Sequence, residues 1–516
     1  MTAKDKILGL IKKTVKGPKD FRKEKILSNL KVFYPEKKEH GDYSTNAAFV
    51  LKDKSLKPLE IAAVLQEKLS KNREFKKVEI AEPGFVNFFL SEEYLHNQIK
   101  EILERKEKLG SLKPAKVEKI NVEFISANPT GPLTLGNARG GFCGDVLANI
   151  LEKAGHKVSR EYYVNDIGGQ VEKKLKLSLE GKEGGYQGPH IEELRKRKIA
   201  DPQEAAKIIL KEWIKPTLKK MGINFNQYVF ESSLKRKKIE NFLKKKGLSY
   251  EKKGAAWFKS TQFGDDKDRV LRKTDGKQTY ILSDIAYLKD KFERGFNELI
   301  YFLGAEHHGY IGRLKAAAEA LGYRKEQVKP ILFQLVKLLK EGKEVRMSKR
   351  KGIYITVDDL LKEINVDVAR YFFLIRGYGN HLLFDLDLAK EQSEKNPVYY
   401  IQYAHARICS ILKKTEDIKP KTANLELLNQ PAELELIKYL IRLPEIIEET
   451  AEDYQVQRLP RYAHDLAGVF HRFYGDCQVL IEDKKLQEAR LALVLATKIV
   501  LKETLNLMGI SAPEKM

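Results

Sequence analysis

The sequence predicts an α/β protein in which a parallel sheet is flanked by a small N-terminal α+β unit and a wholly helical C-terminal unit. Three observations lead to this fold class. Strand-like and helix-like segments alternate between residues 119 and 322, which is typical of a parallel sheet covered by helices. The preceding stretch mixes amphipathic helical patterns with an alternating strand pattern. After Asn396 only apolar stripes of helical period remain.

Residues 1–105 are expected to form the N-terminal α+β unit. The chain begins with an amphipathic helical pattern, and residues 56–71 carry a second one. Residues 78–91 read as a strand, because Val86, Phe88 and Leu90 alternate with polar or outward positions. The stretch 109–119, "LGSLKPAKVEK", resembles a linker.

Residues 106–390 are expected to form the central α/β domain. "KINVEFIS", residues 119–126, reads as a buried strand, and residues 138–155 read as a helix with one apolar stripe and Gly155 at its end. A second strand pattern covers 157–164, and the alternation resumes at 278–322. Between them, residues 171–275 are Lys-rich and less periodic, so we expect an insertion there.

Residues 391–516 are expected to be helical throughout, because four successive segments carry apolar residues at a 3.6-residue period. No run of 18 or more apolar residues occurs in the chain, so no transmembrane helix is expected.

The net charge of +23 over 516 residues has two readings. Either the protein binds a polyanion such as a nucleic acid, or it has a Lys-rich solvated surface. Charge alone does not separate them. The three cysteines form no CxxC pair, so neither a disulfide framework nor a zinc site is indicated.

The stretch "NPTGPLTLGNARGGFCGD", residues 128–145, joins the first strand to its helix. A strand, a Gly-rich turn and a helix N-terminus together make a generic anion site, because free backbone N–H groups and the helix dipole favour phosphate. The signal is weak by itself. The turn "TLGN", Thr134–Asn137, is neither GxGxxG nor a Walker loop.

A second candidate is the basic loop "RMSKRKG", residues 346–352, which lies between two apolar runs. It is either a solvated basic turn or a mobile loop that brings cations onto a polyphosphate.

A third candidate is acidic. Tyr280 and Asp284 are four residues apart, so the start of one helix can present both. Glu123 lies between apolar neighbours in a strand, and a buried carboxylate needs a cationic partner. That partner is either a cationic substrate or an internal salt bridge.

Taken together, these motifs resemble those of class I aminoacyl-tRNA synthetases, and specifically the arginyl-tRNA synthetases. The resemblance spans essentially the whole chain. "SANPTGPLTLGN" stands where the family has its HIGH motif, and "RMSKRKG" resembles the KMSKS loop. Further matches in the family's order are "GDYSTNAA", "EPGFVNFFL", "YVNDIGGQ", "ESSL", "FGDDKDRVLRKTDG", "FDLDLAKEQSEKNPVYYIQYAHARI", "YAHDLAGVFHRFY" and "MGISAPEKM".

The resemblance implies ATP-dependent ligation of L-arginine to tRNA(Arg) through an arginyl-adenylate, with release of pyrophosphate and AMP. It also implies a Rossmann-type catalytic domain, an N-terminal domain at the tRNA elbow and a helical anticodon-binding domain. We expect Mg²⁺ to be carried by ATP and no zinc to be bound. We expect a cytoplasmic monomer that uses no membrane.

The resemblance also implies the site residues. Catalytic roles fall to Thr134, Asn137, Lys349 and Arg346. The ATP-binding set is Gly131, Pro132, Thr134, Gly136, Asn137, Met347, Ser348 and Lys349. The arginine-binding set is Glu123, Asn128, Tyr280, Asp284 and His307.

Two departures from the family pattern concern the nucleotide. Thr134 and Asn137 replace both histidines of HIGH, and Arg346 and Arg350 replace the first Lys and the last Ser of KMSKS. We expect the turn to supply neutral hydrogen-bond donors and the basic loop to supply the positive charge, with Lys349 foremost.

Three alternative functions remain. A catalytically silent relative would bind tRNA without charging it, although the acidic residues of the amino-acid pocket are present. A class I synthetase of another specificity, such as cysteinyl, usually needs zinc ligands that this Cys spacing does not offer. A general nucleic-acid binder would explain the charge but not the acidic pocket.

Overall fold

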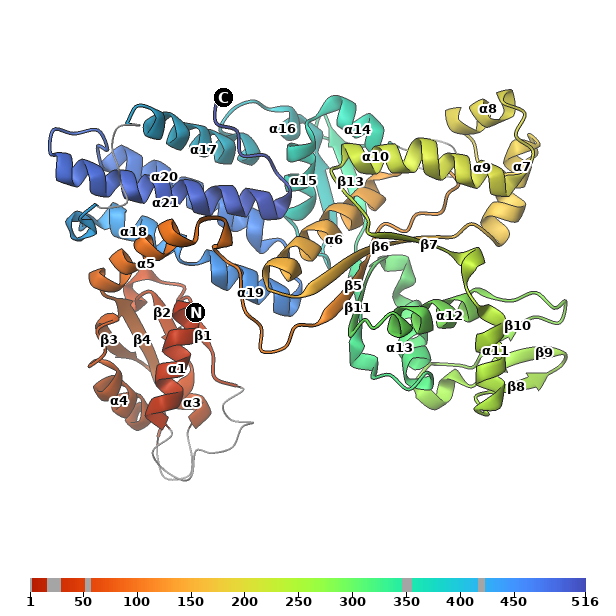
Figure 1. Cartoon of the computed structure of the whole chain (residues 1–516), viewed down its shortest axis with the longest axis horizontal. Coiled ribbons are helices and arrows are strands. Elements are labelled where there is room, and N and C mark those ends of the chain that lie inside the picture. Colours follow the sequence, from red (N-terminus) through yellow and green to blue (C-terminus); the bar gives the residue numbers. More distant parts are fainter. Residues whose placement is uncertain (1, 16–28, 52–56, 346–354, 416–422) are drawn as a thin grey trace.

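The computed structural model describes residues 2–15, 29–51, 57–345, 355–415 and 423–516. Figure 1 shows the N-terminal unit next to the C-terminal helices on one side of a central sheet. The predicted fold class is confirmed, because the central sheet is parallel and the described chain after Asn396 contains helices and no strand.

The N-terminal unit is built on an antiparallel sheet of order β1-β2-β4-β3, with β1 at Val32–Phe33, β2 at Tyr43–Thr45, β3 at Phe75–Ala81 and β4 at Phe85–Leu90. Its helices are α1 (Ala3–Val15), α3 (Ala47–Leu51) and α4 (Pro58–Leu69). The predicted alternation in β4 is confirmed, since Val86, Phe88 and Leu90 are all buried. The next helix, α5 (Glu92–Arg105), packs against helices of the C-terminal unit.

The central sheet has the order β12-β11-β5-β6-β7 and is parallel throughout. Its strands are β5 (Lys119–Glu123), β6 (Lys157–Val164), β7 (Gln227–Phe230), β11 (Glu298–Gly304) and β12 (Val328–Phe333). The chain winds outward from β5 to β7 and then returns to the other side of β5 with β11. Strand order therefore reverses between β5 and β11, and such a reversal opens a crevice at the carboxyl ends of the strands.

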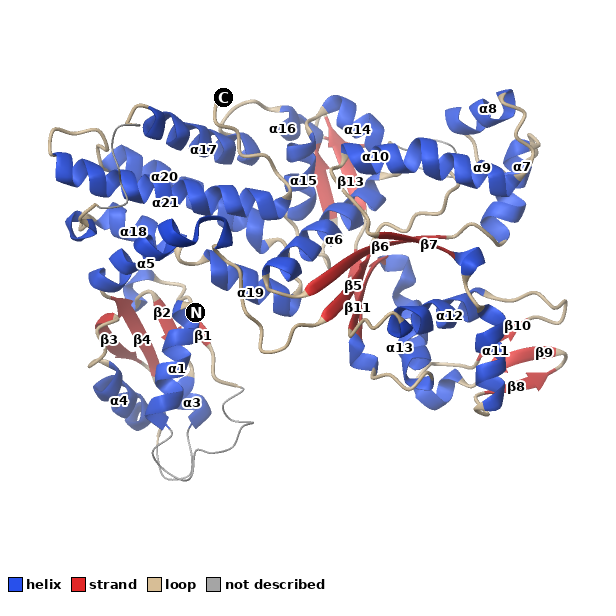
Figure 2. Ribbon diagram, viewed as in Figure 1, coloured by secondary structure: helices blue, strands red, loops and turns tan. Residues whose placement is uncertain are grey.

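Helices cover both faces of this sheet (Figure 2), with α6 (Leu135–Lys153) on one face and α12 (Tyr280–Glu293) and α13 (Ile311–Ala320) on the other. Alternate residues of β11 enter two separate cores. Ile300 and Phe302 pack in the core that contains α6, whereas Leu299 and Tyr301 pack in the core of α12 and α13. The sheet is thus buried on both sides, as parallel sheets usually are.

The segment 171–275, which we expected to be one insertion, contains β7, the fifth strand of this sheet. Two excursions flank that strand. The first holds α7 (Lys176–Leu179), α8 (Pro189–Lys196), α9 (Pro202–Ile209) and α10 (Lys215–Lys220). The second holds α11 (Arg236–Lys245) and a small antiparallel sheet of β8 (Ser249–Lys252), β9 (Ala255–Phe258) and β10 (Arg269–Arg272). The strand β7 is only four residues long, which explains why periodicity did not reveal it.

A second small sheet follows the central one, with β13 (Val336–Lys340) between β14 (Lys343–Val345) and β15 (Leu382–Asp385). The helices α14 (Val357–Glu363), α15 (Val366–Leu374) and α16 (Leu386–Lys390) accompany it. The chain then enters the helical unit, whose members are α17 (Pro397–Lys413), α18 (Pro431–Leu440), α19 (Leu443–Asp453), α20 (Arg458–Asp476) and α21 (Lys484–Met508).

Local sequence explains where the long helices of this unit begin. The Asn396 side chain accepts a hydrogen bond from the Val398 N–H, and Pro397 occupies the first helical position of α17. The Asp483 carboxylate caps α21 in the same way. None of the helices in the described ranges has the length and apolarity that a membrane crossing requires. The three cysteines are buried free thiols.

Candidate active site

The carboxyl ends of β5 and β11 bring several of the predicted site residues to one edge of the sheet. The strand β5 ends at Glu123 and leads through residues 124–133 into α6, which begins beside Thr134. The strand β11 ends at Gly304 and leads into a short 3₁₀ turn that contains His307. These are the two connections that flank the reversal of strand order, where α/β sheets bind their ligands.

The turn that follows β5 is strained. Ile125 and Ser126 have φ angles of +64° and +38°, a region that β-branched residues rarely occupy and that costs free energy. The Ser126 hydroxyl stabilises the turn by donating to Glu123 Oε1 at 3.2 Å and accepting from the Tyr163 N–H at 3.0 Å. This turn redirects the chain from the sheet toward the start of α6.

The glycines of "ARGGFCGD" have a packing role. A Cβ on Gly144 would lie 2.4 Å from the Phe124 ring, so only glycine lets α6 pack this closely on the end of β5. The glycines further along α6 therefore position that helix, and the part of the predicted anion site that remains is the helix N-terminus with the TLGN turn (Thr134–Asn137).

The side-chain oxygen of Asn137 accepts two hydrogen bonds from Thr134, the residue that precedes α6. The Thr134 N–H donates to Asn137 Oδ1 at 3.0 Å, and the Thr134 hydroxyl donates to the same oxygen at 2.9 Å. The amide nitrogen Nδ2 of Asn137 makes no hydrogen bond with any of the residues that the structure describes. Asn137 can thus cap the helix with its oxygen and still offer two N–H donors to a ligand.

The basic loop 346–352, with Arg346, Met347, Ser348 and Lys349, lies outside the described residues. The chain on its C-terminal side returns to the TLGN turn. Thr356 pairs with Thr134 as an isolated bridge, and the Val357 N–H donates to the Leu133 carbonyl at 2.9 Å. The chain that follows the loop is therefore held next to the start of α6.

One face of α12 supplies the acidic side of the crevice. Tyr280 is the first residue of this helix, so the expectation that a helix start presents Tyr280 and Asp284 together is confirmed. Tyr287 and Lys291 continue the same face at the helical spacing. The Tyr280 ring is 52% exposed, whereas Tyr287 and Lys291 lie buried under the sheet.

Asp284 is the most perturbed acid of this face. Burial raises the pKa of Asp284 to about 7; the hydrogen bond from the Tyr310 hydroxyl acts in the opposite direction, and the nearby charges of Glu231 and Glu123 add to the rise. Carboxylates that repel one another favour the binding of a cation between them, because its positive charge reduces the repulsion.

Glu123 already has a partner inside the protein. Its Oε2 lies 2.6 Å from Lys291 Nζ, and that ammonium is fully buried, 4.3 Å and 4.1 Å from the ring centroids of Tyr287 and Tyr301. Lys291 also lies 3.8 Å from Glu161. The internal salt bridge that we set beside a substrate role for Glu123 is therefore present.

Glu231 was missed by the sequence analysis as a member of the pocket. It lies directly after β7, is almost fully buried, and accepts a hydrogen bond from the Ser283 hydroxyl at 2.7 Å. Burial raises the pKa of Glu231, against the hydrogen bond from Ser283. No local signal marked it, because its position at the carboxyl edge of the sheet follows from the strand "QYVF", which is too short for periodicity to reveal.

The remaining predicted residues lie around the rim. The Asn128 amide donates to Gln170 Oε1 at 2.7 Å. The His307 side chain is 52% exposed and lies 3.7 Å from Glu306, so it contacts solvent more than the acidic group. Gly131 and Pro132 are half-buried in the connection to α6, and Gly136 is half-buried in the first turn of that helix.

Comparison with known proteins identifies the chain's relatives. Three family models match: "Arginyl tRNA synthetase N terminal domain" over 2–90, "tRNA synthetases class I (R), catalytic domain" over 98–196 and 177–371, and "DALR anticodon binding domain" over 401–516. An arginine–tRNA ligase of Carboxydothermus hydrogenoformans is 45% identical, with 93% of each chain covered. One of Bacillus subtilis is 43% identical, covering 96% of this chain and 95% of the other.

A solved structure, the Thermus thermophilus arginyl-tRNA synthetase, has the same fold with a TM-score of 0.80 at 22% identity, covering all of both chains. The matches extend from the N-terminal unit to the last helix, in the order in which the motifs occur. The chain therefore belongs to the arginyl-tRNA synthetase family of class I.

Proposed function

We propose that this protein ligates L-arginine to tRNA(Arg) in two steps. In the first, a carboxylate oxygen of arginine attacks the α-phosphorus of ATP; the arginyl-adenylate forms and pyrophosphate leaves. In the second, the terminal ribose hydroxyl of the tRNA attacks the activated carbonyl, loses its proton, and AMP leaves. The observation that carries this proposal is a buried acidic group beside a helix N-terminus at the reversal point of the sheet.

The acidic group fits a guanidinium. Asp284 and Glu231 are two carboxylates whose pKa values are raised by burial, and a guanidinium offers a planar fork of five N–H donors. Lys291 already neutralises the Glu123 carboxylate. We therefore assign Glu123 a positioning role, in which it orients the base of the pocket and the polar end of the substrate. Tyr280 covers the pocket from the start of α12, and Asn128 and His307 contact the substrate from the rim.

For the nucleotide, we assign hydrogen-bond donation to the TLGN turn and charge to the basic loop. The Asn137 Nδ2 group and the backbone N–H groups of the first turn of α6 are the neutral donors. Lys349 and Arg346 belong to that loop, and the chain that follows it is tied to the start of α6 through Thr356 and Val357. Mg²⁺ enters with the ATP phosphates, and the protein contributes positioning and charge stabilisation.

For the tRNA, the helical unit offers a cavity of about 890 Å³ between α17, α20 and the C-terminus. Tyr403 and Tyr474 line it on either side of Arg407, whose guanidinium lies 4.7 Å and 5.0 Å from their ring centroids. Lys414, Lys515 and Met516 are also part of the lining. Aromatic rings stack on the bases of unpaired nucleotides, and cations between the rings neutralise the phosphates. We therefore assign this cavity to the anticodon. We assign the N-terminal unit to the tRNA elbow.

We further propose a cytoplasmic monomer. The silent alternative requires an amino-acid pocket that no longer selects arginine, but the carboxylates Asp284 and Glu231 that a guanidinium would pair with are both present. Aminoacylation of matched tRNA with each of the twenty amino acids tests the proposal. Charging with arginine alone is the expected result; binding of tRNA without charging would establish the silent alternative.

A further inference from the structure

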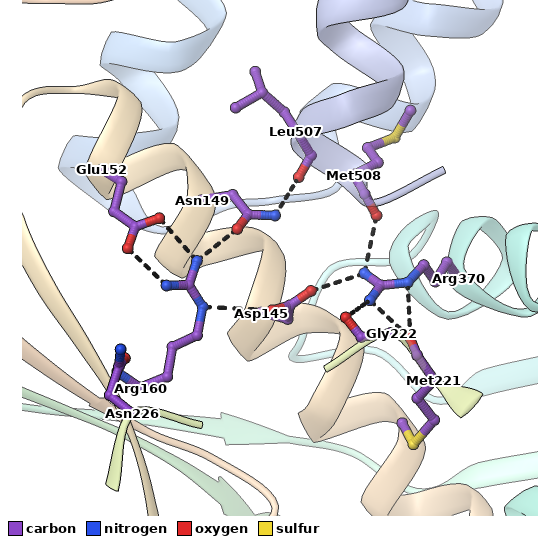
Figure 3. Close-up of polar contacts among 10 residues, drawn as sticks. All are labelled: Asp145, Asn149, Glu152, Arg160, Met221, Gly222, Asn226, Arg370, Leu507 and Met508. Carbon is purple, nitrogen blue, oxygen red and sulfur yellow. Dashed lines mark hydrogen bonds and ion pairs between the residues drawn. The ribbon is translucent and has the colours of Figure 1, made fainter. Parts of the chain in front are cut away.

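A single arginine joins three parts of the chain at the far end of α6 (Figure 3). Arg370, on α15, has a side chain that is only 2% exposed. Its Nη1 donates to Asp145 Oδ2 at 2.9 Å and to the Met508 carbonyl at 3.1 Å. Its Nε and Nη2 donate to the carbonyls of Met221 and Gly222 at 2.8–3.2 Å. The guanidinium therefore binds α6, the end of α10 and the end of α21 at once.

The chemistry of these acceptors favours a guanidinium. Met508 is the last residue of α21, and Met221 follows the last residue of α10. Carbonyls at helix C-termini lack intrahelical partners and carry partial negative charge. Gly509 has a φ of +66°, and a Cβ on it would lie 2.4 Å from Arg370 Nη1. Glycine thus lets the chain leave α21 directly across the face of the arginine.

On the α6 side, the contact extends over about two turns. The Asn149 amide donates to the Leu507 carbonyl at 3.0 Å, and Lys153 Nζ lies 2.6 Å from Glu503. Asp145 is in the same uninterrupted helix as the TLGN turn, about 16 Å along the axis from Thr134 at 1.5 Å per residue. Whatever fixes Asp145 along this axis also fixes the turn.

On the other side, the C-terminal tail 509–516 runs from Arg370 to the anticodon cavity. The Ser511 hydroxyl donates to Asp367, one turn before Arg370 in α15. The Pro513 carbonyl lies 2.8 Å from His405 Nδ1 on α17. The tail then ends in the cavity, where Lys515 and Met516 form part of the wall.

We propose that Arg370 is a positioning residue that links RNA docked in this cavity to the TLGN turn. Nucleotides bound against Lys515 and Met516 restrain the tail; the tail holds the end of α21 against Arg370, and Arg370 holds α6 through Asp145. The correct anticodon thereby raises kcat at a site that it does not touch. The proposal rests on the proposed function, and it assigns to the tail a role in turnover beyond binding.

Contiguous contacts alone do not establish coupling, so the test measures it. Wild-type enzyme is compared on matched tRNA and on tRNA with a substituted anticodon base, with kcat of arginylation and Kd of the tRNA measured separately. Arg370→Lys keeps the charge but loses the planar fork. It should reduce the ratio of the two kcat values by about fivefold or more, the usual lower range of allosteric coupling. Its Kd for matched tRNA and its KM for arginine should stay near the wild-type values.

The matched control is Arg490→Lys. Arg490 is another buried arginine of the helical unit, which donates to Glu433 and to the Gln478 carbonyl at 2.7 Å each. Those partners belong neither to the tail nor to α6. Arg490→Lys should lower Tm while leaving the kcat ratio intact, which separates the linkage from general weakening of the domain.

Several outcomes would overturn the linkage. The linkage is refuted if Arg370→Lys keeps the wild-type kcat ratio, or if Arg490→Lys lowers that ratio equally. It is also refuted if the wild-type enzyme discriminates between anticodons in Kd alone. If Arg370→Lys does not fold, Ser511→Ala on the exposed tail replaces it, and the kcat ratio should again fall; an unchanged ratio refutes the proposal. Failure of the wild type to charge tRNA with arginine would instead overturn the proposed function, and this inference with it.

Discussion

Replacing Asp284 by Asn should weaken arginine binding and, at the same time, stabilise the empty protein at neutral pH. The substitution removes a charged partner of the guanidinium from a desolvated pocket, which typically costs about 2–5 kcal/mol. The KM for arginine should therefore rise by about 30- to 5,000-fold, at 1.36 kcal/mol for each factor of ten. The KM for ATP should change little, because Asp284 lies on α12 and the nucleotide turn lies on α6.

The stability effect follows from the raised pKa of Asp284. The folded value of about 7 lies above the ordinary 3.8, so the folded protein binds this proton more tightly than the unfolded chain does. Stability contributed by this group is present below pH 4 and is lost as the pH rises to 7. The gap corresponds to up to about 4 kcal/mol. Asp284→Asn should thus exceed the wild type in free energy of unfolding by a smaller margin at pH 5, which already lies within this window, than at pH 8.

Both effects can be measured on the same protein pair. Calorimetric Tm at pH 5 and pH 8 gives the stability difference, and steady-state arginylation gives the two KM values. Titration of wild-type enzyme with arginine at pH 6.5, in two buffers of different ionisation enthalpy, should also reveal proton release, because a cation lowers the pKa of Asp284. Asp290→Asn is the control, since Asp290 is an exposed carboxylate on the same helix, 2.8 Å from Arg294.

An unchanged KM for arginine in Asp284→Asn would remove Asp284 from the pocket. A variant less stable than the wild type at pH 8 would refute the electrostatic reasoning, because it would mean that the ionised carboxylate has a structural partner. A response of Asp290→Asn equal to that of Asp284→Asn would trace both effects to the net charge of the helix.

Three further predictions concern the nucleotide turn and the buried ion pair. Asn137→Ala should lower Tm and reduce kcat by roughly 10²–10³-fold. Asn137→Asp keeps the capping oxygen, so its Tm should stay near that of the wild type while its kcat still falls. Full activity of Asn137→Asp would exclude hydrogen-bond donation by the amide. Lys291→Met should lower the free energy of unfolding by about 3–5 kcal/mol, because it leaves Glu123 buried and unpaired. Adding Glu123→Gln should restore part of the lost stability. Identical chemical-denaturation midpoints of the single and the double variant would contradict the pairing. Lys349→Ala should reduce kcat more than Thr134→Ala because it removes a charge as well as a donor, and the reverse order in single-turnover assays would place the nucleotide's charge partner elsewhere.

Patterns among neighbouring residues were sufficient to predict much of the fold and part of the candidate site. The alternation in β4, the apolar runs of β5 and β6 and the helical periods after Asn396 predicted the elements that the structure contains. The four-residue spacing of Tyr280 and Asp284 predicted a shared helix face. Such features depend on residues only a few positions apart, because side-chain direction repeats every 2 residues in a strand and every 3.6 in a helix.

Long-range pairing decided the rest. Periodicity could not identify the four residues of β7 as part of the central sheet, since a strand that short carries no distinctive pattern. It also could not choose between a substrate cation and an internal one for Glu123. That choice depends on Lys291, 168 positions further along the chain, which only the packing of α12 under β5 brings to 2.6 Å.

The sequence by itself therefore predicted the order and type of most elements, the motifs of the family and some of the residues around the ends of β5 and β11. The tertiary structure alone decided which carboxylate is already neutralised, which acid joins Asp284, and how Arg370 connects the last helix to α6. The physical reason is that burial and charge pairing arise between segments distant in sequence, and their free energies depend on distance and solvent exclusion rather than on neighbouring letters.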